Sequence, residues 1–142
     1  MARRALLLSS VLVVLAALAA GPAAAVAPTK PVLLVGVSAS GGFCRPNACH
    51  WEARITTSTI NADGRRPRRL TVAERKALLL AITQLKPASL PPFTGTCPIA
   101  YDGQEFAYRF RGKRALRSCT YDLRRVRAVQ LVNRLVASLR SV

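Results

Sequence analysis

The chain has 142 residues, of which 51% are hydrophobic, and it carries 22 Lys and Arg residues against six Asp and Glu, a formal net charge of +16. This length fits one domain with a sizeable core, and the single histidine, His50, leaves most catalytic triads only one possible base. The arginine excess favours anionic partners such as envelope polymers, unless it reflects only the codon bias of a GC-rich bacterial genome.

Residues 1–25 have the pattern of a secretory signal peptide. Arg3 and Arg4 form a positive start, an apolar run covers 5–20, and an A-x-A cleavage site follows at 23–25. An uncleaved membrane anchor is the alternative, but the run is barely long enough to cross a bilayer. We therefore expect a cleaved signal and a secreted or envelope location.

The expected mature chain has a short leader over residues 26–31 and a single domain over 32–142, with no further stretch that could span a membrane. Nucleic acid is not an expected partner, because an exported protein seldom meets it. In addition, the basic clusters at 65–69 and 111–114 fall in predicted turns rather than along one helix face.

The first half of the domain predicts two strands and a helix. The Val-rich run 31–39 predicts a buried strand, 43–49 a loop, 50–60 an alternating strand, and 61–69 a polar turn that bends at its Asp-Gly pair.

The first helix begins with a capping box. The Thr71 hydroxyl can accept from the amide three residues later, and the Glu74 carboxylate can reach back to the cap amide. Apolar residues recur behind it at helical spacing until Pro87, and a Pro-rich connection follows.

The second half predicts a hairpin and a helix. Strands over 104–111 and 115–121 flank a tight turn, and Asp122 is a candidate cap for a final helix. The fold class is therefore α+β, an antiparallel sheet of about four strands in the order ββαββα with both helices on one face.

Four cysteines in an exported domain favour disulfides and no free thiol. Three pairings are possible, and we favour Cys44–Cys49, which closes a small loop between two strands. The second bond would then be Cys97–Cys119, which ties the Pro-rich connection to the last strand.

The chemistry-bearing residues do not predict catalysis, a metal or a cofactor. Cys44, Cys49 and His50 would need a fourth ligand to hold zinc, and the spacing of the two cysteines differs from that of a c-type haem motif. Four of the six acids fall at expected helix caps or beside turn glycines, so Glu52 and Glu105 are the only carboxylates left for acid–base work.

The order of motifs and predicted elements resembles that of a known family. Ser40-Gly41-Gly42-Phe43 follows the first strand, a capped Leu-rich helix comes next, and an aromatic strand and a Val/Leu-rich helix close the chain. This arrangement, over roughly residues 32–140, resembles the emfourin (protealysin-inhibitor-like) family of small bacterial proteins. The resemblance implies inhibition of thermolysin-like metalloproteases.

Two functions follow as hypotheses. The first is a secreted, non-catalytic protein-binding module, most concretely a protease inhibitor that uses the loop 41–50. Its binding residues would be Gly42, Phe43, Arg45 and Asn47, held by the Cys44–Cys49 bond. The second is a basic envelope protein that binds an anionic polymer.

Overall fold

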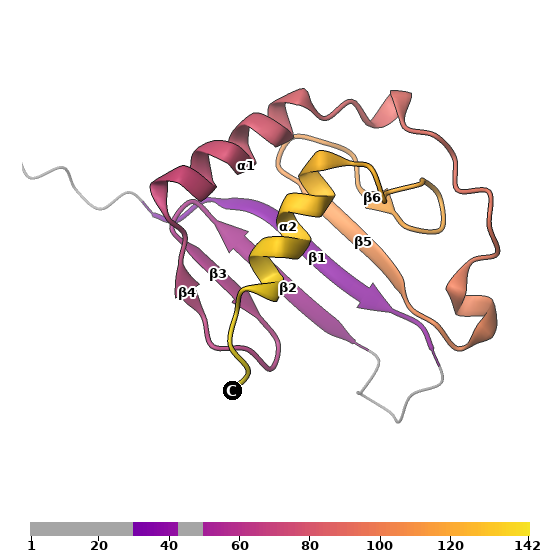
Figure 1. Ribbon diagram of the computed structural model, residues 1–142, viewed down its shortest axis with the longest axis horizontal. Coiled ribbons are helices and arrows are strands. Elements are labelled where there is room, and N and C mark those ends of the chain that lie inside the picture. Colours follow the sequence, from indigo (N-terminus) through magenta and orange to yellow (C-terminus); the bar gives the residue numbers. More distant parts are fainter. Residues whose placement is uncertain (1–29, 43–49) are drawn as a thin grey trace, which may run out of the picture.

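The computed structural model describes residues 30–42 and 50–142, which form an antiparallel sheet with two helices. The strand order is β4-β3-β2-β1-β5-β6, and Figure 1 shows both helices over the same face of the sheet. The strands are β1 (Leu33–Ser40), β2 (Trp51–Thr56), β3 (Thr59–Ala62), β4 (Arg68–Arg69), β5 (Glu105–Phe110) and β6 (Leu116–Arg117). The helices are α1 (Val72–Gln84) and α2 (Arg127–Ala137), with short 3₁₀ turns η1 (Pro87–Ser89) and η2 (Pro98–Tyr101).

The predicted α+β class is confirmed, but the predicted four strands and their order are wrong, because four strands precede α1. The stretch 50–60 is two strands, since the Thr56 hydroxyl accepts from the amides of Ser58 at 3.2 Å and Thr59 at 2.9 Å and turns the chain there. The predicted turn over 61–69 does bend at Gly64, which has a positive φ of 66°, but it ends in β4.

The last strand and helix also differ from the prediction. Only Leu116–Arg117 pairs in the sheet, because the Arg117 carbonyl accepts from the amides of Thr120 and Tyr121 and the chain turns away. Asp122 does not cap α2, because the Asp122 carboxylate instead accepts a hydrogen bond from Arg124. The N-cap residue of α2 is Val126.

The core lies between the helices and one face of the sheet. Alternate strand residues point to this face, and both helices bury apolar side chains against them. The buried strand residues include Val35, Val37, Ala53, Ile55, Ile60, Tyr108 and Phe110, and the helices contribute Leu78, Ile82, Val129, Val132 and Leu135. We call the other side of the sheet, which neither described helix covers, the open face.

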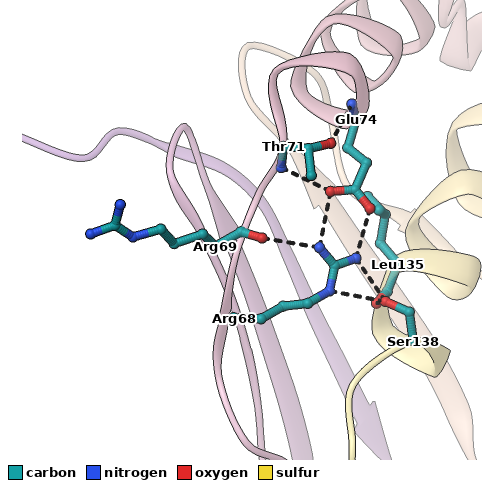
Figure 2. A network of polar contacts seen from close by, with 6 residues as sticks. All are labelled: Arg68, Arg69, Thr71, Glu74, Leu135 and Ser138. Atoms are coloured by element: carbon teal, nitrogen blue, oxygen red, sulfur yellow. Dashed lines mark hydrogen bonds and ion pairs between the residues drawn. The ribbon is translucent and has the colours of Figure 1, made fainter.

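The capping box of α1 is confirmed, and it also joins α1 to the end of α2 (Figure 2). Glu74 accepts from the Thr71 amide at 2.9 Å and from both terminal nitrogens of Arg68, at 2.9 and 2.7 Å. The same guanidinium donates to the Ser138 hydroxyl at 2.7 Å, and that hydroxyl donates to the Leu135 carbonyl. The pKa of Glu74 is lowered to about 2, and the hydrogen bond from Arg68 is the largest cause.

Candidate functional site

The predicted inhibitory loop lies mostly outside the described residues. Phe43, Arg45, Asn47 and the predicted Cys44–Cys49 bond all fall within 43–49, so the structure does not place them. The loop's two ends are described, at Gly42 and His50. His50 is exposed and lies 3.0 Å from Glu52, through Nε2 and Oε1.

The end of the loop at Gly41 and Gly42 packs tightly against η2 and the residues after it. Both glycines have positive φ, 94° and 96°. A Cβ on Gly42 would lie 2.9 Å from the Asp102 carbonyl oxygen, and one on Gly41 would lie 2.9 Å from the Ile99 side chain. Backbone conformation and close packing therefore both require glycine here.

A concave apolar site lies beside the Pro-rich connection, and we call it the aromatic groove. Three aromatic side chains line it, Phe93, Phe106 and Tyr121, together with Leu123 and with polar groups that include Ser118. Its volume is about 430 Å³, within the usual range of ligand sites. Phe106 is 36% exposed although it faces the helix side of the sheet, so the groove leaves aromatic surface open to a partner.

The groove is held by links between segments far apart in the chain. The predicted Cys97–Cys119 disulfide is confirmed and joins the Pro-rich connection to the chain after β6. Next to it the Phe93 amide donates to the Thr120 carbonyl at 3.1 Å, and the Asp122 amide donates to the Pro91 carbonyl at 3.0 Å. Figure 1 shows this connection running along the edge of the sheet between α1 and β5. The groove wall is thus preorganised.

Glycine also shapes this wall. A Cβ on Gly95 would lie 2.9 Å from the ring of Phe93. The ring therefore lies against the bare backbone of Gly95, and a larger residue there would displace it.

The rim of the groove is charged. Asp122 accepts from the Arg124 guanidinium at 2.9 and 2.8 Å, and this hydrogen bonding lowers the pKa of Asp122 to about 2. Arg114 lies over the Tyr121 ring, 5.9 Å from its centroid, and is in none of the ion pairs between described residues. The groove therefore has one neutralised ion pair at its rim and one available cation beside the ring of Tyr121.

The open face carries the second candidate surface, and it is basic at its centre. Arg54 of β2 and Arg109 of β5 both pair with Gly36 of β1, one from each side. Gly36 lies between the buried Val35 and Val37, so it belongs to the open face. Both arginines are exposed.

The carboxylates predicted to be available for acid–base work are both held by cations. Glu52 lies 3.3 Å from Arg54, and hydrogen bonding, first of all from His50, lowers its pKa. Glu105 is buried and lies 2.9 Å from Arg117. Since both also lie on the open face, they serve there as counter-charges to the arginines.

The described residues contain neither a cluster of metal-ligating side chains nor a membrane-spanning helix. No group of three or more His, Cys, Asp or Glu side chains in that part of the chain could hold a metal ion. Among the helices described, none is long and apolar enough to cross a membrane.

Comparison of the chain with protein-family models, with curated proteins and with solved structures finds no match. The resemblance to the emfourin family therefore stays a prediction.

Sequence reasoning missed both surfaces. The aromatic groove depends on Phe93, Phe106 and Tyr121, which come together only through the disulfide and the pairing of the Pro-rich connection. A signal existed for the open face, because Gly36 interrupts an otherwise Val-rich strand.

Proposed function

We propose that this protein is a non-catalytic module that binds another protein outside the cytoplasm, with the aromatic groove as its binding site. The observation that carries the proposal is the exposed aromatic surface on a wall held by a disulfide. Aromatic side chains contribute much of the energy of protein interfaces, and a preformed site loses little entropy on binding. The disulfide is compatible with an extracellular location.

The groove's chemistry indicates the occupant. Its lining is mainly apolar, which suits an aromatic or aliphatic side chain, while Arg114, over the ring of Tyr121, favours an acidic neighbour. We therefore propose as occupant an extended segment of an extracellular protein, with an apolar anchor next to an acidic residue.

The experiment identifies a partner from the culture supernatant of the producing organism and measures its affinity for purified variants. Phe106→Ala removes exposed aromatic surface from the groove, and we expect at least a tenfold loss of affinity, about 1.4 kcal/mol. Leu79→Ala is the matched control, because Leu79 is also an exposed apolar side chain, 41% accessible, but lies on α1.

The proposal fails if Phe106→Ala and Leu79→Ala bind the partner equally well. It also fails if affinity collapses at high salt, because burial of apolar surface survives the screening that abolishes exposed charge contacts. If the purified protein carries a small molecule in the groove and that molecule blocks the partner, the proposed occupant is the small molecule and not a protein.

The protease-inhibitor hypothesis remains a second candidate, and the packing of Gly41 and Gly42 favours it. Both contact the segment 99–103, which follows the disulfide-bonded Cys97, so the loop 41–50 starts from a fixed base. A rigid base lowers the entropic cost of inserting a loop into a cleft.

Inhibition is tested as residual activity of thermolysin-like metalloproteases after addition of the protein. We expect inhibition at micromolar concentration. We also expect Arg45→Ala to weaken it by about tenfold or more with an unchanged melting temperature, since arginine is enriched at binding hot spots. Several such proteases left fully active would eliminate this candidate without affecting the aromatic groove.

A further inference from the structure

Gly36 occupies a position where the fold does not require glycine. It lies inside β1, which pairs with β2 on one side and β5 on the other. Its backbone does not adopt a positive φ, and a Cβ placed on it would meet no atom within 4 Å. Glycine weakens a strand interior, and one reason for it there is close approach of a ligand to the backbone.

The neighbours of Gly36 identify the ligand's charge. Arg54 and Arg109 flank it in register, and neighbouring strands are about 4.8 Å apart, so the two Cα atoms are about 10 Å apart across bare backbone. Arginine side chains are long enough to meet above such a gap. Ser38, two residues along β1, places a hydroxyl group on the same face.

The acids of the open face lie toward one end of it. Glu52 pairs with Ser38, and Glu105 pairs with Ser40, farther along β1. Arg69 lies beyond Arg54, at the β4 edge of the sheet and away from these acids. It is exposed and pairs with Thr59 of β3. An anionic chain that crosses the strands over Gly36 therefore passes Arg54, Arg69 and Arg109. It also meets Glu52, which lies 3.3 Å from Arg54 and competes with the phosphate for that guanidinium.

The geometry also distinguishes between anions. A phosphodiester carries its charge in the polymer backbone, so the chain itself must come close to the sheet for the phosphate oxygens to reach Arg54 and Arg109, and the bare backbone at Gly36 permits this. A carboxylate at the end of a side chain, as in polyglutamate, needs no such approach of the polymer backbone. The aromatic residues of the strands, Trp51, Phe106, Tyr108 and Phe110, lie on the helix side, in register with Ala39, Val37 and Val35. The strands therefore offer no stacking platform for bases on the open face, which disfavours nucleic acid.

We infer that the open face binds a base-free polymer of phosphodiester-linked polyol or sugar units, with one phosphate over Gly36 between Arg54 and Arg109. This site goes beyond the proposed protein-binding function, because it lies on the opposite side of the sheet from the aromatic groove. The net charge of the chain suggests binding to an anionic envelope polymer but does not indicate where. That binding site lies on the open face.

The test measures binding of a fluorescently labelled poly(glycerol phosphate) chain to the exported protein at low salt. Gly36→Val is the decisive variant, because a β-branched residue suits a strand and a Cβ at this position meets no atom within 4 Å, yet the side chain covers the backbone beneath the phosphate. We expect at least a tenfold loss of affinity with an equal or higher melting temperature. Arg54→Gln and Arg109→Gln should each lose about tenfold.

Arg75→Gln is the matched control, since it removes the same charge from an exposed arginine on α1. We expect it to change affinity less than twofold. Wild-type affinity in Gly36→Val, or equal losses for Arg75→Gln and Arg54→Gln, would overturn the site in favour of diffuse attraction.

Three further probes test the ligand class. Polyglutamate of matched charge should bind more weakly than poly(glycerol phosphate), and equal binding would overturn the preference for phosphate. Tighter binding of a single-stranded oligonucleotide would assign the face to nucleic acid instead, and tighter binding of anionic phospholipid vesicles would assign it to a membrane surface.

Discussion

Individual residues show how a strongly basic chain uses its few acids. Glu74 binds Arg68, Glu105 binds Arg117, and Asp122 binds Arg124, so these carboxylates serve to hold arginines in place. Glu74 has the largest structural role, because it closes the capping box and also connects α1 through Arg68 to the end of α2 (Figure 2).

We predict that Glu74→Gln lowers the free energy of unfolding by roughly 1–2 kcal/mol at pH 7, through the weakened cap and ion pair. The pKa of Glu74 is lowered to about 2 in the folded chain, from an ordinary value of 4.5. Its stabilising effect is therefore complete above pH 4.5 and disappears as the pH falls toward 2. Denaturant unfolding at several pH values measures this.

Asp102→Asn is the control for Glu74→Gln. It removes the same charge from an exposed residue, and asparagine tolerates the left-handed backbone found there, at a φ of 59°. We expect nearly wild-type stability at pH 7. An effect of Glu74→Gln that stays constant from pH 7 to pH 2 would contradict the role of the ionised carboxylate.

Among the elements, the Pro-rich connection between α1 and β5 differs most from an ordinary loop. It forms one wall of the aromatic groove and is joined to the chain after β6 by the disulfide and by the hydrogen bonds of Phe93 and Asp122. These links replace the longer β6 that the sequence predicts.

We predict that the double variant Cys97→Ser/Cys119→Ser loses roughly 2–4 kcal/mol of stability, since the bond closes a loop with a sequence separation of 22. Its melting temperature should fall by on the order of 10 °C. Amide exchange should speed up between residues 91 and 98, and affinity at the aromatic groove should fall more than affinity at the open face. Unchanged exchange there would show that the hydrogen bonds alone hold the wall.

The elements show which parts of the fold the sequence can predict. The capping box and the turn at Gly64 are local, so residue spacing alone identified them. The turn after Thr56 was missed because threonine also suits a strand. The segment after Arg117 was missed because its partners, Pro91 and Phe93, lie far away in the sequence.

The candidate sites were less predictable than the fold for the same reason. Gly36 acquires meaning only when the register places Arg54 and Arg109 beside it. Three aromatic residues become a groove only when the disulfide brings their segments together.

At the scale of the whole molecule, one sheet separates two different surfaces. The two described helices cover one side, where the aromatic groove lies at the edge, and neither of them covers the open face (Figure 1). The groove is mainly apolar and the centre of the open face is basic, so the two surfaces should respond differently to salt.

We predict that a protein partner in the groove and a phosphodiester polymer on the open face bind at the same time and depend differently on salt. Contacts of Arg54, Arg69 and Arg109 with phosphates should give log K against log salt a slope of about −2, whereas groove binding should have a slope near zero. Arg109→Gln should reduce the polymer's slope by about 0.7 and leave the groove unaffected. Titrating each ligand in the presence and absence of the other measures all of this. Competition between them, or equal salt slopes, would mean that one surface serves both partners.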